Sequence, residues 1–94
     1  MALILSFKDK ETESFYHSGK SKVFPQEIQK RALLKLDALS YATNTKDLKA
    51  PPSNHLEKLS GNLQGFYNIL INAKYRIIFK FDTNAYEVSI LDYH

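Results

Sequence analysis

The 94-residue sequence contains no cysteine and no tryptophan, and only three glycines, three prolines and three histidines. The absence of cysteine excludes disulfides, thiolate-bound metal sites and cysteine nucleophiles, and it fits the reducing cytoplasm. The histidines, at positions 17, 55 and 94, are too widely spaced for a local metal-binding motif. We therefore expect acid–base chemistry that uses no metal and no other cofactor.

Long apolar segments are also missing. No run approaches the roughly 20 residues that a membrane-spanning helix needs, and the N-terminal apolar stretch is too short for a signal-peptide core. Charged residues make up 24% and hydrophobic residues 44% of the chain, a composition that indicates an ordered protein. Because a chain this short closes one modest core, residues 1–94 are expected to form a single cytoplasmic domain that does not enter a membrane.

The net charge is +3, from 13 basic and 10 acidic residues. The surplus lies in the first half, because residues 51–94 hold four basic and four acidic residues. This balance is compatible with an anionic partner such as nucleic acid. If nucleic acid binds to the second half, the placement of charge matters more than its amount.

The first half of the sequence predicts one strand and two helices. Residues 3–7 are mainly apolar and predict a strand. A short helix follows, which Asp9 can cap and Gly19 can end in a left-handed conformation. A longer helix is expected over Pro25–Tyr41, because proline is favoured at the first helical position.

The longer helix has an apolar stripe at helical spacing, formed by Ile28, Ala32, Leu36 and Leu39 and widened by Leu33. The residues expected to face water are Gln29, Lys30 and Asp37. Residues 42–54 contain Pro51-Pro52, which excludes a helix or central strand there. They predict a loop, with one helical turn near Lys46–Lys49.

From Leu56 onward the hydrophobic period changes to two, which indicates strands. Strands are expected over residues 56–59, 66–71, 74–81 and 85–91. In the third of these, the side chains alternate strictly: Tyr75, Ile77, Phe79 and Phe81 face one way, and Lys74, Arg76, Ile78 and Lys80 the other. The predicted fold is α+β, with two N-terminal helices packed on an antiparallel-rich sheet of about five strands, the first strand at an edge.

The last turn decides which residues of the final hairpin share a face. A three-residue loop centred on Thr83 predicts three pairs: Phe81 with Ala85, Arg76 with Ile90, and Lys74 with Asp92. Lys74, Arg76 and Asp92 then lie on one face near one end of the sheet. A two-residue loop shifts the partners by one and separates them.

The chain ends in an acid, a phenol and an imidazole: Asp92, Tyr93 and His94. Together with a fixed cation such as Arg76, these groups suit RNA cleavage without a metal. One group takes the proton of a ribose 2′-hydroxyl, another protonates the leaving 5′-oxygen, and the cation neutralises the phosphate. The plain alternatives are that His94 is a solvated tail and Arg76 a surface cation whose stem covers apolar area.

Several segments together carry a family resemblance. They are Ile4–Lys8, Leu36–Leu39 with Ala42-Thr43, Pro51–Gly61, Gly65–Ile69, Tyr75–Phe79 and the closing Asp92-Tyr93-His94. In this order and spacing, the chain resembles the HigB branch of the RelE superfamily of bacterial toxins over nearly its whole length.

The resemblance implies the toxin of a type II toxin–antitoxin pair, a metal-independent endoribonuclease that enters the ribosomal A site and cuts messenger RNA during translation. It implies that Arg76 holds the scissile phosphate. In the implied catalytic end, His94 transfers a proton, Tyr93 stacks on or orients a base, and Asp92 orients a neighbour. The candidate phosphate contacts are Lys58, Lys74 and Lys80.

One departure from the family concerns the general base. Other members have a histidine where Glu57 stands, whereas this chain has His55 two residues earlier. Strand alternation puts both side chains on one face, so either can serve the same pocket. Which of the two is the base, and which contacts RNA, stays open.

The resemblance also implies a partner, an antitoxin with a helix-turn-helix domain encoded next to the toxin. The complex would bind operator DNA through that partner. A second hypothesis is a non-catalytic module that keeps the fold and binds only an antitoxin or the ribosome.

Overall fold

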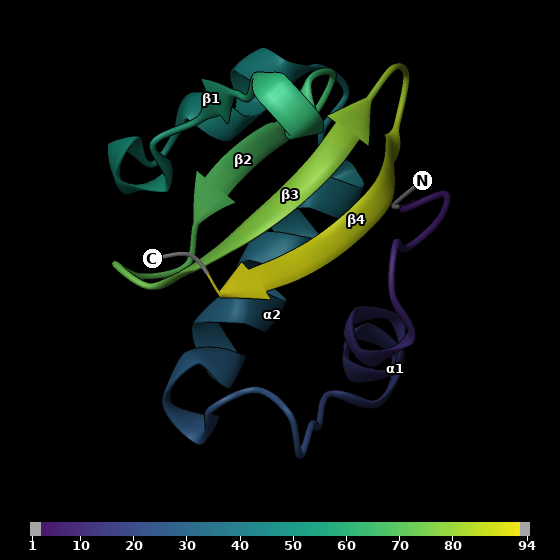
Figure 1. The fold of residues 1–94 in the computed structure, drawn as a ribbon, viewed down its shortest axis with the longest axis vertical. Coiled ribbons are helices and arrows are strands. Elements are labelled where there is room, and N and C mark those ends of the chain that lie inside the picture. Colours follow the sequence, from purple (N-terminus) through teal and green to yellow (C-terminus); the bar gives the residue numbers. More distant parts are fainter. Residues whose placement is uncertain (1–2, 93–94) are drawn as a thin grey trace.

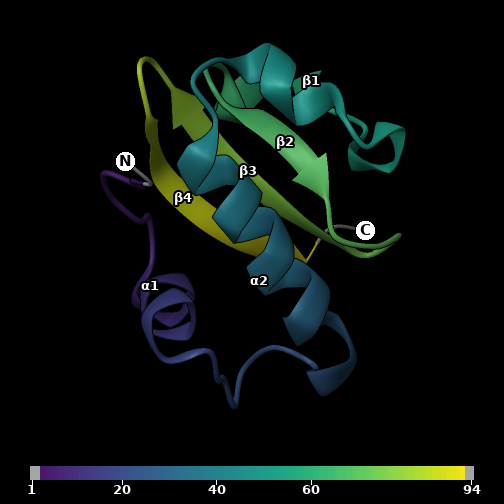
Figure 2. The same cartoon turned by 180° about the vertical axis from the view of Figure 1, so that it is seen from behind.

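A computed structural model describes residues 3–92. The helices are α1 (Lys10–Ser18) and α2 (Gln26–Tyr41), with short 3-10 helices η1 (Thr45–Lys49), η2 (Pro52–Asn54) and η3 (Gly61–Leu63). The strands are β1 (Glu57–Lys58), β2 (Tyr67–Leu70), β3 (Tyr75–Phe81) and β4 (Ala85–Asp92). They form one sheet in the order β1-β2-β3-β4, in which every neighbouring pair is antiparallel. Figures 1 and 2 show α2 crossing one face of this sheet and α1 lying beside β4.

The helix ends follow from local chemistry. Asp9 caps α1 by accepting a hydrogen bond from the backbone nitrogen of Thr12 at 3.0 Å, and Gly19 ends it with φ of 77°. Both predictions are therefore confirmed. The longer helix begins at Gln26, one residue later than predicted, because the extended backbone of Pro25 (ψ 140°) makes it the N-cap.

The predicted apolar stripe of α2 is confirmed, because Ile28, Ala32, Leu36 and Leu39 are all buried. Gln29, which we expected to face water, is buried instead. Its side-chain nitrogen donates to the carbonyl oxygens of Ser21 (3.0 Å) and Phe24 (2.9 Å). The amide thus ties the connection between the helices to α2. η1 confirms the helical turn predicted near Lys46–Lys49.

The N-terminal segment, residues 3–7, does not form the predicted fifth strand. It lies beside β4 and makes two isolated parallel bridges, Ile4 with Ala85 and Phe7 with Val88. The backbone of Glu87, between these two contacts, has φ of 50°, a left-handed conformation that interrupts a regular ladder. The backbone nitrogen of Glu87 donates instead to the hydroxyl oxygen of Ser6 at 2.9 Å.

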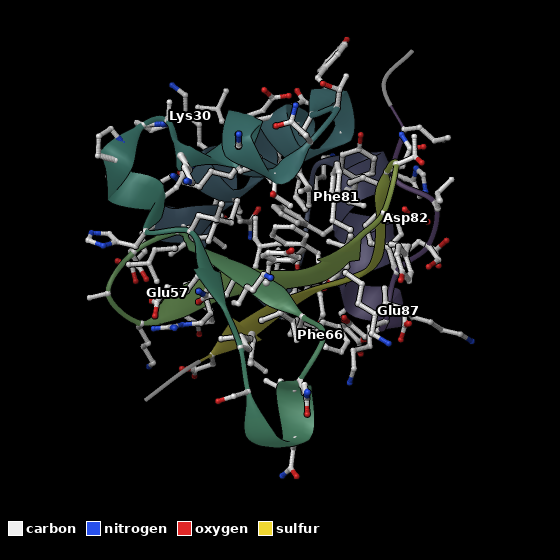
Figure 3. The ribbon with its side chains drawn as sticks, turned by 90° about the horizontal axis from the view of Figure 1, so that it is seen from above. Lys30, Glu57, Phe66, Phe81, Asp82 and Glu87 are labelled. Atoms are coloured by element: carbon white, nitrogen blue, oxygen red, sulfur yellow. The ribbon has the colours of Figure 1, made fainter. Side chains whose placement is uncertain are left out.

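The sheet has an inner face, covered by α2, and an outer face on the opposite side. Tyr75, Ile77, Phe79 and Phe81 pack in the inner core, as the alternation predicted, and Tyr67 and Ile69 of β2 pack there with them. The outer face carries Phe66, Asn68, Arg76, Ile78 and Lys80, and η3 lies on this side, opposite α2 (Figure 3). Within residues 3–92, no helix is both long and apolar enough to cross a bilayer.

Candidate functional site

Arg76 lies on the outer face, on β3, one residue after the start of that strand. Its direct neighbours are Leu70 on β2 and Leu91 on β4. The side chain is half-buried and borders a cavity of about 170 Å³ that is also lined by Leu59, Ser60, Leu63, Ile78 and Leu91. Partial burial reduces the screening of a charge by water, and a guanidinium is always charged, so Arg76 is a cation suited to a phosphate.

A residue that sequence reasoning missed binds this cation. Nη1 of Arg76 donates a 2.8 Å hydrogen bond to Oδ1 of Asn68, which is fully buried on β2. The available signal is the asparagine itself, a polar side chain within the apolar run of residues 66–71. A buried amide requires a partner, and Arg76 lies diagonally across from it on the next strand.

Glu57 lies on the same face, one strand further along. It pairs directly with Asn68 across β1 and β2, and directly opposed residues of an antiparallel pair point to the same side of the sheet. Its side chain is exposed (Figure 3). Glu57, Asn68 and Arg76 therefore form a row across three strands, with a carboxylate at one end and a guanidinium at the other.

His55 does not share this face, so that prediction is wrong. Strand alternation does not reach it, because β1 begins at Glu57 and His55 ends η2 with φ of 48°. It lines a groove of about 590 Å³ between α2 and the η2 segment, together with Arg31 and Lys35. Partial burial, and secondarily the charge of Arg31, lower the pKa of Lys35 in this groove.

The register of the last hairpin confirms one predicted pair and contradicts the other two. Phe81 pairs with Ala85, but Arg76 lies opposite Leu91 and Asp92 lies opposite Tyr75. The cause is a bulge, because β4 has one residue more than β3 between the pairs Lys80–Tyr86 and Ile78–Ser89.

The bulge therefore separates Asp92 from Arg76. The register puts Asp92 on the side of Tyr75, so it does not share the outer face with Arg76 as predicted. Lys74 and Asp92 do meet, with their charged atoms 3.9 Å apart. The other two residues of the predicted catalytic end, Tyr93 and His94, lie outside the described residues.

The candidate phosphate contacts occupy three different places. Lys80 shares the outer face with Arg76, lies 3.2 Å from the carboxylate of Glu87 and stands over the ring of Phe66. Lys58 is exposed on β1 and stands over the ring of Tyr67. Lys74 is exposed at the turn before β3. Of these three, Lys80 lies within β3 on the same face as Arg76, Lys58 lies on the face of Tyr67, and Lys74 lies outside the strand.

A metal-binding cluster is absent from the part of the chain that the structure describes, since no three His, Asp or Glu side chains gather there. The groups that the outer face offers are a carboxylate, an amide and cations. Such a set can bind a phosphate and move a proton.

Comparisons with known proteins agree over nearly the whole chain. Residues 5–94 match the model of the HigB-like toxin family, described as RelE-like toxins of type II toxin–antitoxin systems. Toxin HigB-1 of Vibrio cholerae is 38% identical over 93 residues, covering 98% of each chain. Endoribonuclease HigB of Proteus vulgaris is 30% identical over 93 residues, covering 98% of this chain and all of the relative.

A solved structure shares the fold. In the YoeB–YefM complex from Staphylococcus aureus, the matching chain is 22% identical, with a TM-score of 0.59 over 100% of this chain and 98% of that chain. With two helices and a four-stranded antiparallel sheet, and with its sequence relatives, this chain belongs to the HigB family of RelE-like toxins from type II toxin–antitoxin systems.

Proposed function

We propose that this toxin is a ribosome-dependent endoribonuclease that cuts messenger RNA without a metal. The observation that carries the proposal is the row of Glu57, Asn68 and Arg76 on the outer face, the side of the sheet opposite α2. It offers a proton acceptor and a held cation on one side of the sheet. The name of the Proteus vulgaris relative supports the reaction class.

In the proposed reaction, Arg76 binds the scissile phosphate and stabilises the charge that builds on it. Glu57, the candidate base on the same face, removes the proton of the ribose 2′-hydroxyl. The 2′-oxygen then attacks phosphorus, and the bond to the 5′-oxygen breaks as that oxygen receives a proton. His94 is the proposed donor of that proton, Tyr93 and Asp92 are proposed to assist it, and Lys80 is the proposed second contact to the RNA backbone.

The proposed partner is an antitoxin with a helix-turn-helix domain, through which the complex binds operator DNA. The Staphylococcus aureus structure that shares the fold is itself a complex, YoeB–YefM, and so supports a protein partner. The proposed place of action is the ribosome in the cytoplasm. Co-expression with the protein encoded by the adjacent reading frame tests the partner, because a genuine antitoxin abolishes growth arrest and co-purifies with the toxin.

The experiment for the activity uses the two arginines of the chain, Arg31 and Arg76. After induction in a bacterial host, the 5′ ends of messages are mapped for the wild type, Arg76→Ala and Arg31→Ala. We expect ribosome-positioned cuts from the wild type and from Arg31→Ala, and a loss of roughly 10²- to 10³-fold from folded Arg76→Ala, the range for removal of one charge-stabilising group. Growth arrest without message cuts would instead support the binding-only module.

A further inference from the structure

We propose that Asn68 is a positioning residue that fixes the guanidinium of Arg76 for the reaction, an inference that rests on the proposed function. The central contact is the 2.8 Å hydrogen bond from Nη1 of Arg76 to Oδ1 of Asn68. A guanidinium can only donate hydrogen bonds, so the amide must present its oxygen to Arg76. The nitrogen of the same amide then points elsewhere.

This arrangement lowers the stability of the fold at the amide nitrogen of Asn68. Nδ2 of Asn68 is buried and has no hydrogen-bond partner among residues 3–92. A buried donor without an acceptor destabilises a protein. The neighbours of Asn68 on the outer face include Phe66 and the directly opposed Ile78, which are both buried and apolar. An apolar side chain of similar volume would therefore suit this position better if packing were its purpose.

The effect of Asn68 on Arg76 explains why an asparagine occupies this position. Arginine has a long side chain that loses considerable rotational freedom when it is ordered. The bond to Asn68, together with Leu70 and Leu91 on either side, orders the guanidinium before any substrate binds. Because an amide is neutral, it orients the cation without cancelling its charge, as a carboxylate at position 68 would. The side chain of Asn68 thus adds no negative charge beside the guanidinium.

The test is a double-mutant cycle of Asn68→Leu and Arg76→Ala, measured as single-turnover cleavage on message-programmed ribosomes across toxin concentrations. We expect Asn68→Leu to lower the rate at saturating toxin roughly 10- to 100-fold, as loss of positioning does. In the Arg76→Ala background, the same change should alter the residual rate by less than about twofold, because coupled residues are not additive. The thermal midpoint of Asn68→Leu should shift by no more than roughly 8 °C.

Gln29→Leu is the matched control, because it removes another buried amide, which binds backbone oxygens far from the outer face. It should lower stability and leave the saturating cleavage rate unchanged. Asn68→Thr, which suits a strand and whose hydroxyl is too short to reach Arg76, replaces Asn68→Leu if that variant fails to fold.

Two results would overturn this inference. One is that Asn68→Leu lowers the cleavage rate as much in the Arg76→Ala background as in the wild type. The other is that Asn68→Leu does not lower the rate in the wild-type background. If the wild type and Arg31→Ala cut and Arg76→Ala does not, the proposed function stands whatever Asn68 does. If the wild type does not cut message, the proposed function itself fails.

Discussion

Glu57 and His55 show how a difference of two residues separates two candidate bases. The exposed carboxylate of Glu57 shares the outer face with Arg76, whereas His55 lines the groove beside α2. In the proposed reaction, a proton acceptor must lie within hydrogen-bond reach of the 2′-hydroxyl while Arg76 binds the adjacent phosphate. The geometry therefore favours Glu57.

We predict that Glu57→Gln lowers the saturating cleavage rate by roughly 10²-fold, within the usual contribution of a general base. The matched variant His55→Gln should lower the rate by less than about threefold. A general base contributes far more than threefold, and His55 is not the expected base. Both rates come from single-turnover cleavage on programmed ribosomes. The reverse ranking of the two variants would assign the base to His55.

A second prediction at this scale concerns Asp47 in η1. The backbone nitrogen and the hydroxyl of Thr43 donate to its carboxylate at 2.9 and 3.1 Å, and these bonds lower the pKa of Asp47. A lowered pKa stabilises the fold above the ordinary aspartate value of about 3.9, and this contribution is lost as pH falls. Asp47→Asn should therefore be less stable than the wild type at pH 7, with a difference that shrinks below pH 4.

Urea unfolding midpoints at pH 7, 5 and 3.5 measure this difference. Asp37→Asn, at an exposed aspartate on α2, is the control for a simple change of net charge. A difference between Asp47→Asn and the wild type that is the same at all three pH values would contradict the prediction.

Single residues also show what the sequence could not reveal. The positions of Arg76 and Glu57 on strands follow from alternation, so these candidates were accessible. The burial of Gln29 and Asn68 could not be predicted in this way. The backbone oxygens that bind the amide of Gln29, and the guanidinium that binds Oδ1 of Asn68, come from other segments. Hydrophobic pattern identifies an apolar side chain in a core, but it does not reveal a polar partner.

Among the elements, α1 and β4 are joined by a small buried network. The hydroxyl of Thr12 donates to Asp9 at 2.9 Å and accepts from the backbone nitrogen of Ile90 at 3.0 Å, and Ser89 donates to the same carboxylate at 2.6 Å. Thr12 is fully buried. One hydroxyl therefore both supports the start of α1 and satisfies the backbone of β4.

We predict that Thr12→Val lowers the free energy of unfolding by about 1–3 kcal/mol, because it leaves the nitrogen of Ile90 buried without an acceptor. Thr83→Val, in the exposed turn before β4, should change it by less than about 0.5 kcal/mol, as surface substitutions do. Urea unfolding compares the two. Equal stability of both variants would show that the network adds nothing.

The elements themselves were largely predictable, since helix stripe, caps and strand alternation all follow from local pattern. The register of the final hairpin was not. The three-residue turn and the pair Phe81–Ala85 are as predicted, but the extra residue near Glu87 changes every pair beyond it. A bulge at a residue other than glycine leaves little mark in a sequence, and the expected strand over residues 3–7 is reduced to two bridges beside it.

At the scale of the whole molecule, the site is shallow. The cavity beside Arg76 measures about 170 Å³, below the roughly 300–1,000 Å³ of pockets that enclose a small ligand. This cavity can take one phosphate but is too small to enclose and bend a nucleotide. We expect this shape in an enzyme whose RNA substrate is held by the ribosome.

We predict that the chain cuts purified messenger RNA at least about 10²-fold more slowly than the same message on ribosomes, since positioning of the reacting atoms contributes factors of this size or larger. Cleavage rates of one end-labelled message, free and ribosome-bound, at equal toxin concentration give the comparison. Comparable rates on free message would show that the chain bends its substrate alone.

The extra residue in β4 has a consequence for changes in chain length. Deleting Glu87 would leave the pairs on either side of it intact, because Val88 alone would then oppose Phe79. The two bridges of the N-terminal segment, however, depend on equal spacing. Ile4 and Phe7 are three residues apart, and their partners Ala85 and Val88 are three residues apart only while Glu87 is present. A one-residue deletion would thus spare the hairpin and misalign the N-terminal segment that leads into α1, so relatives of different length at this point should differ near their first residues and not around Arg76.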